Sequence, residues 1–377
     1  LAELGSHVTK VEQPSGDIVR IAPPQRQGQS AYYLQLNGGK RNLSIDLNWP
    51  EAREAALKLC QETDVIVENF RPGTMKTFGL DYETVRQQNP AVVYVSMSGY
   101  GQNTPWSTRP AFAPTVQAES GATQTQMDHF GDDLLQPVTD WASHADVYTG
   151  LEGAIAVLAG LNKRNATGTG VHGDVSMMAT MLAVNERLHA QINELDAADE
   201  PLALGAPESP IFKVADGSFV TIAASPISSG VFMRYCGMMG RNDLRTDSRF
   251  ATPALRRENL KALLNEVQNW MRSFRSFEEL EYQVSGAGGL AVGKVRTAAD
   301  LLETDWAQAA EPTYTSLVGD LEIRLPKGPW LFNGKDTGAL SAAAPRGANN
   351  REVLSEAGFD DATIKAWEDA GILSSDL

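Results

Sequence analysis

Short β-rich runs alternate with helical patterns through the first hundred residues, and this order constrains the fold more than any other feature. The runs typical of strands are HVTKVE (7–12), LSIDL (43–47), DVIVENF (64–70) and AVVYVSMSGYG (91–101). Helical patterns over NWPEAREAALKLCQET and over residues 79–90 separate the later runs. Strands that alternate with helices favour a mostly parallel sheet covered by helices. We therefore predict an α/β fold.

Two loops follow these strands at the edge where open parallel sheets bind ligands, beyond the carboxyl ends of the strands. They are VENFRPG, from Val67 to Gly73, and SMSGYGQ, from Ser96 to Gln102. We expect a ligand at this edge. The next stretch, residues 102–145, is polar and without clear periodicity, which is typical of a long functional or disordered loop.

The second half of the sequence begins with a helix, a strand and a further helix, expected at 147–163, 171–177 and 178–195. A linker-like stretch over 196–209 precedes a second unit. That unit opens with the hairpin IFKVADGSFVTIAAS, whose tip pair Asp-Gly suits positive backbone φ. Helices at 228–240 and 255–273, an extended section at 311–335 and a C-terminal helical pair complete the expected order.

Net charge, apolar run length and cysteine usage exclude several classes of protein. The chain has 47 acidic and 32 basic residues, a net charge of −15, which argues against nucleic-acid binding. Its longest apolar runs, such as 153–161, are about half of a membrane span, and no signal peptide is evident. Cys60 and Cys236 lack metal-binding spacing, as expected of thiols in a reducing compartment. We expect a cytoplasmic protein with no nucleic-acid or membrane partner.

Two motifs imitate functional sites. GTGVHG (168–173) matches a dinucleotide fingerprint, but that fingerprint leaves a strand and enters a helix, whereas the order expected here is reversed. MDHFGDD (127–133) offers Asp128, His129, Asp132 and Asp133, without a second His or Cys group to complete a metal site. We therefore predict a solvated loop at MDHFGDD and no metal.

The segment DWASHADVYTG places Asp140, His144 and Asp146 within seven residues. On an extended strand, His144 and Asp146 would point the same way and could act as an acid/base pair. In the simpler alternative, Asp146 caps a helix that begins at Val147. The Gly/Ala-rich helix behind it would permit close approach of another group, and its free N–H groups could steady an oxyanion. Spacing alone favours the cap.

Nine stretches in order resemble the family III CoA-transferases, which include formyl-CoA and carnitine CoA-transferases and the related α-methylacyl-CoA racemases. The resemblance extends from Leu1 to the C-terminus. The stretches are LAELGSHVTKVEQPSGD, NGGKRNLSIDLNWPEAREAALKL, DVIVENFRPGTMKTFGLDYETV, NPAVVYVSMSGYGQ, ADVYTGLEGAIAVLAGL, TGTGVHGDVSM, DGSFVTIAA, DSRFAT and REVLSEAGFDDATIKAWEDAGI.

The resemblance implies that Asp146 is a catalytic nucleophile. The family's aspartate stands just before the Gly/Ala-rich helix and 22 residues ahead of a GxG, and Asp146 holds that place. The implied reaction moves CoA from an acyl-CoA to a free carboxylic acid through anhydride and aspartyl-CoA thioester intermediates, with CoA as substrate and no permanently bound cofactor.

The resemblance also implies positions that bind CoA. These are Gln13 after the first strand, Ile45, Asp46 and Leu47 in LSIDL, and Asn69, Phe70 and Arg71 in ENFRPG. Arg71 could pair with phosphate, and Phe70 could face the adenine or the pantetheine. For Ile45 and Phe70, a place in the hydrophobic core is an equally good alternative.

Domain organisation and oligomeric state also follow from the resemblance. It implies a Rossmann-like large domain over 1–200, a smaller α+β domain over 205–305, a return segment over 306–377 packing on the large domain, and an interlocked homodimer. The family's first strand and most of its first helix have no counterpart here, so we expect the natural protein to be longer at its N-terminus.

Two other functions stay open beside CoA transfer. A racemase of this family has a His about thirty residues before the Asp, where this chain has Phe112. An acyl-CoA racemase or epimerase would therefore have to use His144 with Asp146. The other alternative is a non-catalytic CoA-binding half of a larger protein.

Overall fold

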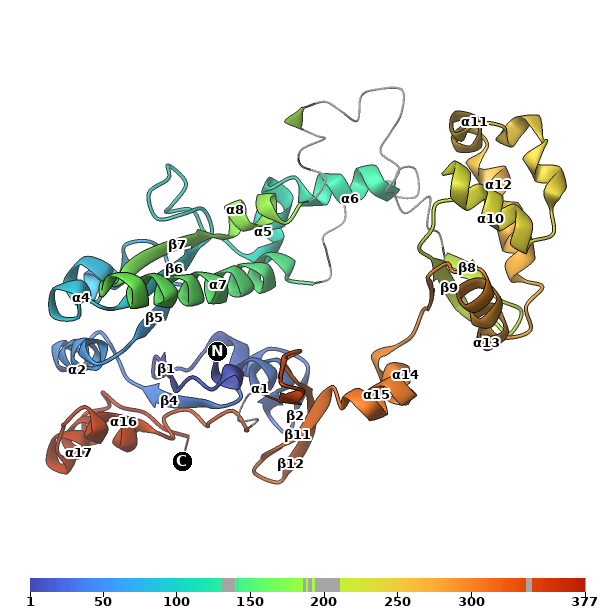
Figure 1. Ribbon diagram of the computed structural model, residues 1–377. Coiled ribbons are helices and arrows are strands. Elements are labelled where there is room, and N and C mark those ends of the chain that lie inside the picture. Colours follow the sequence, from blue (N-terminus) through green and yellow to red (C-terminus); the bar gives the residue numbers. More distant parts are fainter. Residues whose placement is uncertain are drawn as a thin grey trace. The chain divides into compact units, whose positions relative to one another are not determined.

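The computed structural model describes residues 1–130, 140, 142–185, 188, 192–193, 211–336 and 341–376. The chain divides into two compact units, each described here by itself (Figure 1). The first unit comprises Leu1–Val116, Ser143–Met181 and Asp305–Leu377, and the second comprises Gln117–Ala142 and Leu182–Thr304.

The first unit contains two parallel sheets. Strand β1 (Val8–Glu12) pairs in parallel with β4 (Lys40–Ser44). Strands β5 (Val65–Glu68), β6 (Val93–Ser98) and β7 (Val171–Ser176) form a parallel sheet in that order. The prediction of an α/β fold with parallel sheets is confirmed. The strand expected at 43–47 is β4, which begins at Lys40 and ends at Ser44, before the chain turns toward the next helix.

Helices cover both faces of the sheet β5-β6-β7. On one face, helix α7 (His144–Thr167) packs along β6 and β7, with Val93, Val95 and Val157 in the core between them (Figure 1). On the other face, Tyr94 packs with α4 (Tyr82–Gln88). Alternate residues of β6 therefore face opposite helical layers, as a strand buried on both sides requires.

The C-terminal segment of the chain packs on β4 and α2 (Pro50–Gln61). A shared core joins Ile45, Ala52 and Ala55 to residues of α16 (Asn350–Glu356) and α17 (Asp361–Asp369). The backbone of Ile45 also bridges to Leu373. The end of the chain thereby encloses residues that follow β4.

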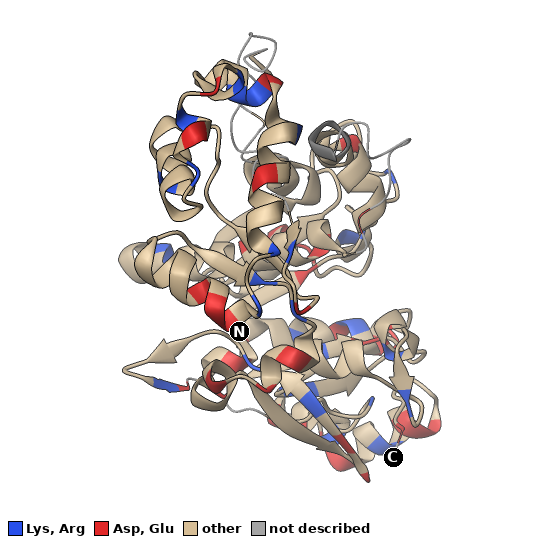
Figure 2. Cartoon of the chain, turned by 90° about the vertical axis from the view of Figure 1, so that its right-hand side faces the viewer, with Lys and Arg blue, Asp and Glu red and all other residues tan. Residues whose placement is uncertain are grey.

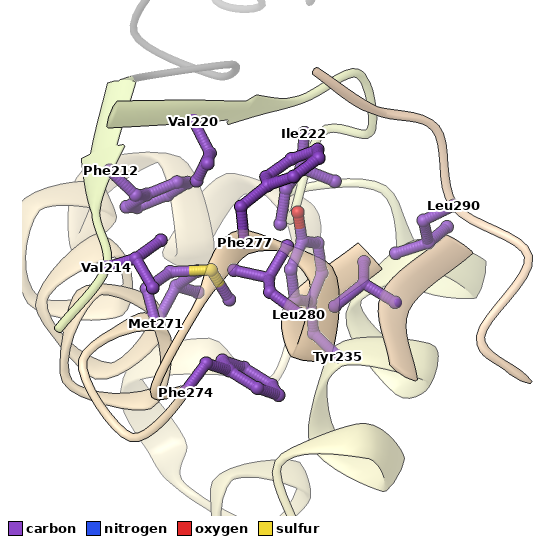
Figure 3. Close-up of a cluster of buried hydrophobic side chains, with 12 residues drawn as sticks. Phe212, Val214, Val220, Ile222, Tyr235, Met271, Phe274, Phe277, Leu280 and Leu290 are labelled. Atoms are coloured by element: carbon purple, nitrogen blue, oxygen red, sulfur yellow. The ribbon is translucent and has the colours of Figure 1, made fainter. Parts of the chain in front are cut away.

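The second unit is built on an antiparallel sheet. Strands β8 (Ile211–Lys213) and β9 (Phe219–Ile222) form the predicted hairpin, and β10 (Val292–Lys294) pairs with β9. Gly217 at the hairpin tip has a φ of +91°, the conformation that its Asp-Gly pair predicts. Figure 3 shows the sheet's inner side chains meeting those of the helices in one core, which includes Phe212, Tyr235 and Met271.

The remaining elements complete the two units. They are η1 (Ala2–Leu4), η2 (Ile18–Ile21), β2 (Gln25–Arg26), β3 (Gln29–Ser30), α1 (Ala31–Asn37), α2 (Pro50–Gln61), α3 (Thr74–Thr77), α5 (Ala113–Glu119), α6 (Ala122–Phe130), α8 (Met177–Ala183), α10 (Ser229–Met238), η6 (Asn242–Arg245), η7 (Ser248–Phe250), α11 (Pro253–Glu258), α12 (Leu260–Met271), α13 (Phe277–Glu281), η8 (Tyr282–Ala287), α14 (Ala298–Leu302), α15 (Asp305–Ala310), β11 (Thr313–Val318), β12 (Leu321–Pro326), β13 (Leu331–Phe332) and β14 (Lys335–Asp336).

Two expectations for the middle of the chain need correction. The stretch 102–145, predicted to be irregular, contains helices α5 and α6. The helix expected at 178–195 is described as α8, which ends at Ala183, and most of 186–195 lies outside the described residues. Among the described helices, none is long and apolar enough to cross a membrane. In the view of Figure 2, basic and acidic residues lie interspersed.

Candidate active site

Asp146 lies in the first turn of α7. The helix begins at His144, with Ser143 at the N-cap position, so Asp146 is the third helical residue. The prediction that Asp146 caps a helix starting at Val147 is therefore wrong by three residues. An acid in the first turn still interacts favourably with the positive end of the helix.

Two glycines fix where α7 presents Asp146. A Cβ on Gly153 would meet the Met97 sulfur at 2.5 Å, and a Cβ on Gly160 would meet Val93 Cγ1 at 2.5 Å. The helix therefore runs antiparallel to β6 at close range. Because a helix rises 1.5 Å per residue, Asp146 lies about 10 Å beyond Gly153, past the level of Met97. That position is at the carboxyl edge of the sheet, where ligands of parallel sheets bind.

The environment of Asp146 favours a reactive carboxylate. Its side chain is exposed, but neighbouring protein atoms remove part of its hydration, and this burial raises its pKa. The exposure of the side chain and the raised pKa are consistent, because one side of a carboxylate can stay hydrated while the other side contacts protein atoms. A less hydrated carboxylate is a stronger nucleophile toward an acyl carbonyl.

Tyr32 on α1 is a neighbour of Asp146 that sequence reasoning missed. Burial raises the pKa of Tyr32, and the negative charges of Asp146 and Asp17 raise it further. Asp17 belongs to the loop after β1, so the charges of that loop and of the first turn of α7 both act on Tyr32. Nothing in the spacing between positions 32 and 146 signals this proximity.

His144 does not share a face with Asp146. The extended segment that would have aligned them is helical, and residues two positions apart on a helix do not face each other. His144 instead stacks on Tyr148, with ring centroids 5.4 Å apart and an interplanar angle of 6°. The predicted alignment of His144 and Asp146 on a strand is therefore wrong.

Asn69, Phe70 and Arg71 follow β5 at the same carboxyl edge, and all three are exposed. Phe70 is 47 % exposed, so its ring is not a core residue. The backbone N–H of Phe70 donates to Glu68 Oε2 at 2.9 Å, which holds the turn just after the strand. One sheet thus brings this loop and the first turn of α7 to one edge.

The other predicted ligand-binding positions lie after β1 and β4. Gln13 is exposed directly after β1, and its amide donates to the Gly16 carbonyl at 3.3 Å. Ile45 is 1 % exposed, so its side chain packs in the core rather than toward a ligand. Asp46 accepts hydrogen bonds from Asn48 at the turn into α2. Leu47 is half-buried at the margin of the same core.

A buried carboxylate supports the loop after β1. Glu12 accepts hydrogen bonds from Arg20, Tyr33 and Asn42 at 2.7 to 3.1 Å, and from the backbone N–H of Asp17 at 3.0 Å. Burial alone would raise the pKa of Glu12, but the hydrogen bonds and the Arg20 charge outweigh it and lower the pKa. The network ties α1, which carries Tyr32, to this loop.

The structure describes the whole of GTGVHG and only part of MDHFGDD. Gly168 of GTGVHG ends α7 with a φ of +75°, and the chain then enters β7, the reverse of a dinucleotide fingerprint. Of MDHFGDD, residues 127–130 end α6, and Asp132 and Asp133 lie outside the described residues. Phe112, at the position of the racemase His, is exposed.

Three known proteins with related sequences are named as CoA-transferases or acyl-CoA transferases. The succinyl-CoA:mesaconate CoA-transferase of Haloarcula hispanica is 31 % identical over 317 residues, covering 80 % of this chain and 76 % of that protein. A succinyl-CoA–D-citramalate CoA-transferase of Chloroflexus aurantiacus is 29 % identical, covering 94 % of this chain and 88 % of that protein. A probable fatty acyl-CoA transferase of Mycobacterium tuberculosis is 30 % identical, with the same two coverages.

Solved structures agree with the sequence relatives. A crystal structure of the same M. tuberculosis protein matches with a TM-score of 0.78 and 26 % identity, covering 93 % of this chain and 92 % of that one. A CaiB/BaiF family protein from Brucella suis matches with a TM-score of 0.75 and 27 % identity, with the same coverages. The model of CoA-transferase family III matches residues 1–350. The chain therefore belongs to the family III CoA-transferases and is an enzyme of the CoA-transferase class.

Proposed function

We propose that this enzyme transfers CoA from an acyl-CoA thioester to a free carboxylic acid, with Asp146 as the nucleophile. The observation that carries the proposal is the place of Asp146. It is a partly desolvated carboxylate in the first turn of α7, at the sheet edge shared with Asn69, Phe70 and Arg71. Such an edge accommodates a ligand as long as CoA across several strand ends.

The first half of the reaction loads CoA onto the enzyme. Asp146 Oδ attacks the thioester carbonyl carbon, the C–S bond breaks, and CoA leaves as a thiolate, giving a mixed anhydride. The thiolate then attacks the Asp146 carbonyl carbon. The anhydride C–O bond breaks, the donor acid leaves as a carboxylate, and an aspartyl-CoA thioester remains.

The second half transfers CoA to the acceptor. The acceptor carboxylate attacks the aspartyl-CoA carbonyl, expels CoA thiolate and forms a second mixed anhydride. The thiolate attacks the acceptor's acyl carbon, which releases the new acyl-CoA and restores the Asp146 carboxylate. No proton is gained or lost overall. The positive end of the α7 dipole lies beside Asp146 and favours the developing oxyanions.

The proposed CoA-binding groups divide by chemistry. Arg71 pairs with a CoA phosphate, and the exposed Phe70 ring lies against the adenine or the pantetheine. Gln13, Asn69 and Asp46 supply polar contacts at the strand ends. Ile45 serves only through its backbone in the turn after β4, because its side chain is buried, and the half-buried Leu47 belongs to the same turn.

The relatives suggest the substrate class. Those described above include enzymes named for succinyl-CoA as donor and for mesaconate or D-citramalate as acceptor. We propose a short dicarboxylic acid as the acceptor and the CoA thioester of a different short dicarboxylic acid, such as succinyl-CoA, as the donor. A panel of acyl-CoA donors against mono- and dicarboxylates checks this choice.

The decisive experiment compares wild type with Asp146→Ala. We expect at least a thousandfold loss of CoA transfer with retained CoA binding, because no other group takes the acyl or CoA moiety. Borohydride or hydroxylamine should modify Asp146 of the wild type only when acyl-CoA is present. Full transferase activity in the variant would overturn the proposal.

Two further assays on the wild type separate the alternatives. Deuterium incorporation at the α-carbon of acyl-CoA from heavy water, without an acceptor acid, would indicate a racemase or epimerase. The helix places His144 and Asp146 on different faces, which does not favour that reaction. Tight CoA binding without exchange onto any acid would indicate a non-catalytic CoA-binding protein.

We also propose a Rossmann-like large domain over 1–200, a small domain over 205–305, a return segment over 306–377, and a cytoplasmic homodimer. The parallel sheets support the first part of this proposal. The free thiols of Cys60 and Cys236 fit a reducing compartment. Light scattering coupled to size-exclusion chromatography measures the oligomeric state.

A further inference from the structure

Glu68 is a buried carboxylate directly beneath the loop that follows β5. It is the last residue of the strand and 9 % exposed. Its Oε2 accepts the Phe70 N–H at 2.9 Å, so the carboxylate holds the backbone two residues ahead of it. Strand register places Glu68 beside Ser96 on β6, and Ser96 beside Asp174 on β7.

Ser96 and His172 extend this contact across the sheet. The Ser96 hydroxyl hydrogen-bonds the Glu68 carboxylate, and its Oγ lies 2.9 Å from His172 Nε2. An ionised carboxylate only accepts, and a hydroxyl has one proton to give. Ser96 therefore donates to Glu68, and His172 carries its proton on Nε2 and donates to Ser96. Stacking on Tyr82, at 4.9 Å between ring centroids, holds the His172 ring.

The burial of the Glu68 carboxylate lowers the stability of the fold. Burial raises its pKa, the Ser96 and Phe70 hydrogen bonds lower it, and the nearby negative charge of Asp174 raises it again, so the net shift is upward. The described donors to its carboxylate, Phe70 N–H and the Ser96 hydroxyl, carry no charge. A carboxylate buried without a cation destabilises a fold. A residue with this cost is expected where it serves another purpose. Perturbed groups of this kind collect at functional sites.

We propose that Glu68 is a positioning residue for acyl-CoA binding, which fixes the backbone of the Asn69–Phe70–Arg71 loop and is itself oriented by Ser96 and His172. The inference rests on the proposed function, because it requires Phe70 and Arg71 to contact CoA. Glu68 need not touch the substrate. Glu68 acts by holding the Phe70 N–H, because the orientation of this backbone group determines where the side chains of Phe70 and Arg71 point.

The test measures KM and kcat for acyl-CoA in three variants. Glu68→Ala removes the acceptor, and we expect KM to rise about tenfold while kcat changes less than about threefold, as for a lost hydrogen bond to a charged group. Glu68→Gln should stay within about threefold of wild type. Its Oε1 still accepts the Phe70 N–H and its amide donates to Ser96. The Ser96 hydroxyl then donates to His172 Nε2, and the neutral imidazole carries its proton on Nδ1 instead.

Asp360→Ala is the matched control. Asp360 also holds a backbone N–H with its carboxylate, that of Thr363 at 2.7 Å, but on the exposed start of α17. This variant should lose stability without a change in KM. If Glu68→Ala does not fold, Glu68→Asp replaces it, since the shorter side chain keeps the charge but not the reach to Phe70, and the same rise in KM is expected.

The outcomes distinguish the inference from the proposed function. An unchanged KM in Glu68→Ala, or a KM rise equal in the Gln variant, would overturn the positioning role. Phe70→Ala and Arg71→Ala test the loop directly. If these two raise KM and Glu68→Ala does not, only the inference fails. If neither raises KM, the proposed CoA contacts of the loop fail with it.

Discussion

A Cβ atom added to Gly160 would lie 2.5 Å from Val93 Cγ1 and 3.1 Å from Val171 Cγ1. Glycine is thus required where α7 crosses β6 and β7, because no side chain fits between the helix backbone and these two valines. The close approach fixes the position of the helix along the sheet. At about 1.5 Å per residue, Asp146 then lies about 21 Å along the helix from this crossing.

The two glycines Gly160 and Gly150 should respond oppositely to alanine. Gly160→Ala should lower the free energy of unfolding by about 1–3 kcal/mol, because β-branched neighbours cannot move away from the added methyl. Gly150, on the same helix, has nothing within 4 Å of an added Cβ. Gly150→Ala should therefore raise the free energy of unfolding by about 0.5–1 kcal/mol, because alanine has the higher helix propensity. Urea denaturation measures both, and equal effects would contradict the packing described.

CoA exchange should lose its rate in acid at a higher pH than an ordinary aspartate implies. Asp146 must be ionised to attack, and burial raises its pKa above the usual 3.8. As pH falls through this raised pKa, the carboxylate is protonated and the rate falls. Exchange of labelled CoA into acyl-CoA suits the measurement, because it involves no free carboxylic acid. Circular dichroism must show that the fold persists over the range, and a rate that stays flat to pH 4 would refute the expectation.

Arg71→Ala should raise KM for acyl-CoA about tenfold, because a charge-assisted hydrogen bond to phosphate is worth about 1.5–3 kcal/mol. Arg71→Lys should fall between wild type and the alanine variant, since lysine keeps the charge but not the two-pronged geometry. Added salt should raise the wild-type KM more than that of the alanine variant. Identical salt responses would place Arg71 away from the phosphates.

Arg20→Met should destabilise the loop after β1. The side chains of Glu12 and Arg20 are 2 % and 16 % exposed, with 2.8 Å between Arg20 Nε and Glu12 Oε2. Loss of one partner of a buried pair lowers the free energy of unfolding by about 3–5 kcal/mol.

The pH dependence of this defect has a fixed sign. The pKa of Glu12 is lowered in the wild type, so its contribution is present above the ordinary 4.5 and is lost as pH falls through the lowered value. The gap between variant and wild type should therefore be full at pH 7 and narrow in acid, where Glu12 is protonated in both. Denaturant titrations at the two pH values check this, and a gap that widens in acid would contradict the network.

Local patterns predicted much of the fold because the relevant interactions are close in sequence. Alternating strand and helix patterns indicated parallel strands, and the pair Asp216-Gly217 indicated the tip of the β8–β9 hairpin. The start of α7 was misplaced because the N-cap depends on how the chain enters the helix, which no short pattern specifies. Helices α5 and α6 were missed because their sequences have weak amphipathic periodicity.

The candidate site shows the same division. The family resemblance singled out Asp146, because an acid just before a small-residue helix and 22 residues ahead of a GxG is a local feature. Its role as the nucleophile stays a prediction. Tyr32 could not be found, because only folding brings it near Asp146. The burial of Ile45 depends on the chain end, where Leu373 pairs with it. For Phe70 the sequence left the hydrophobic core and the CoA site equally open. The residue follows the end of β5 at Glu68, and its side chain is exposed.

Residue patterns alone indicated the α/β class, the hairpin of the second unit and an acid beside the small-residue helix. Each depends on residues within one or two turns or strands of one another. Long-range packing set where that acid lies along the sheet, which predicted positions remain exposed, and the meeting of Glu68, Ser96 and His172. Those three residues come from adjacent parallel strands separated by whole helices, and their meeting depends on strand register, which long-range packing sets.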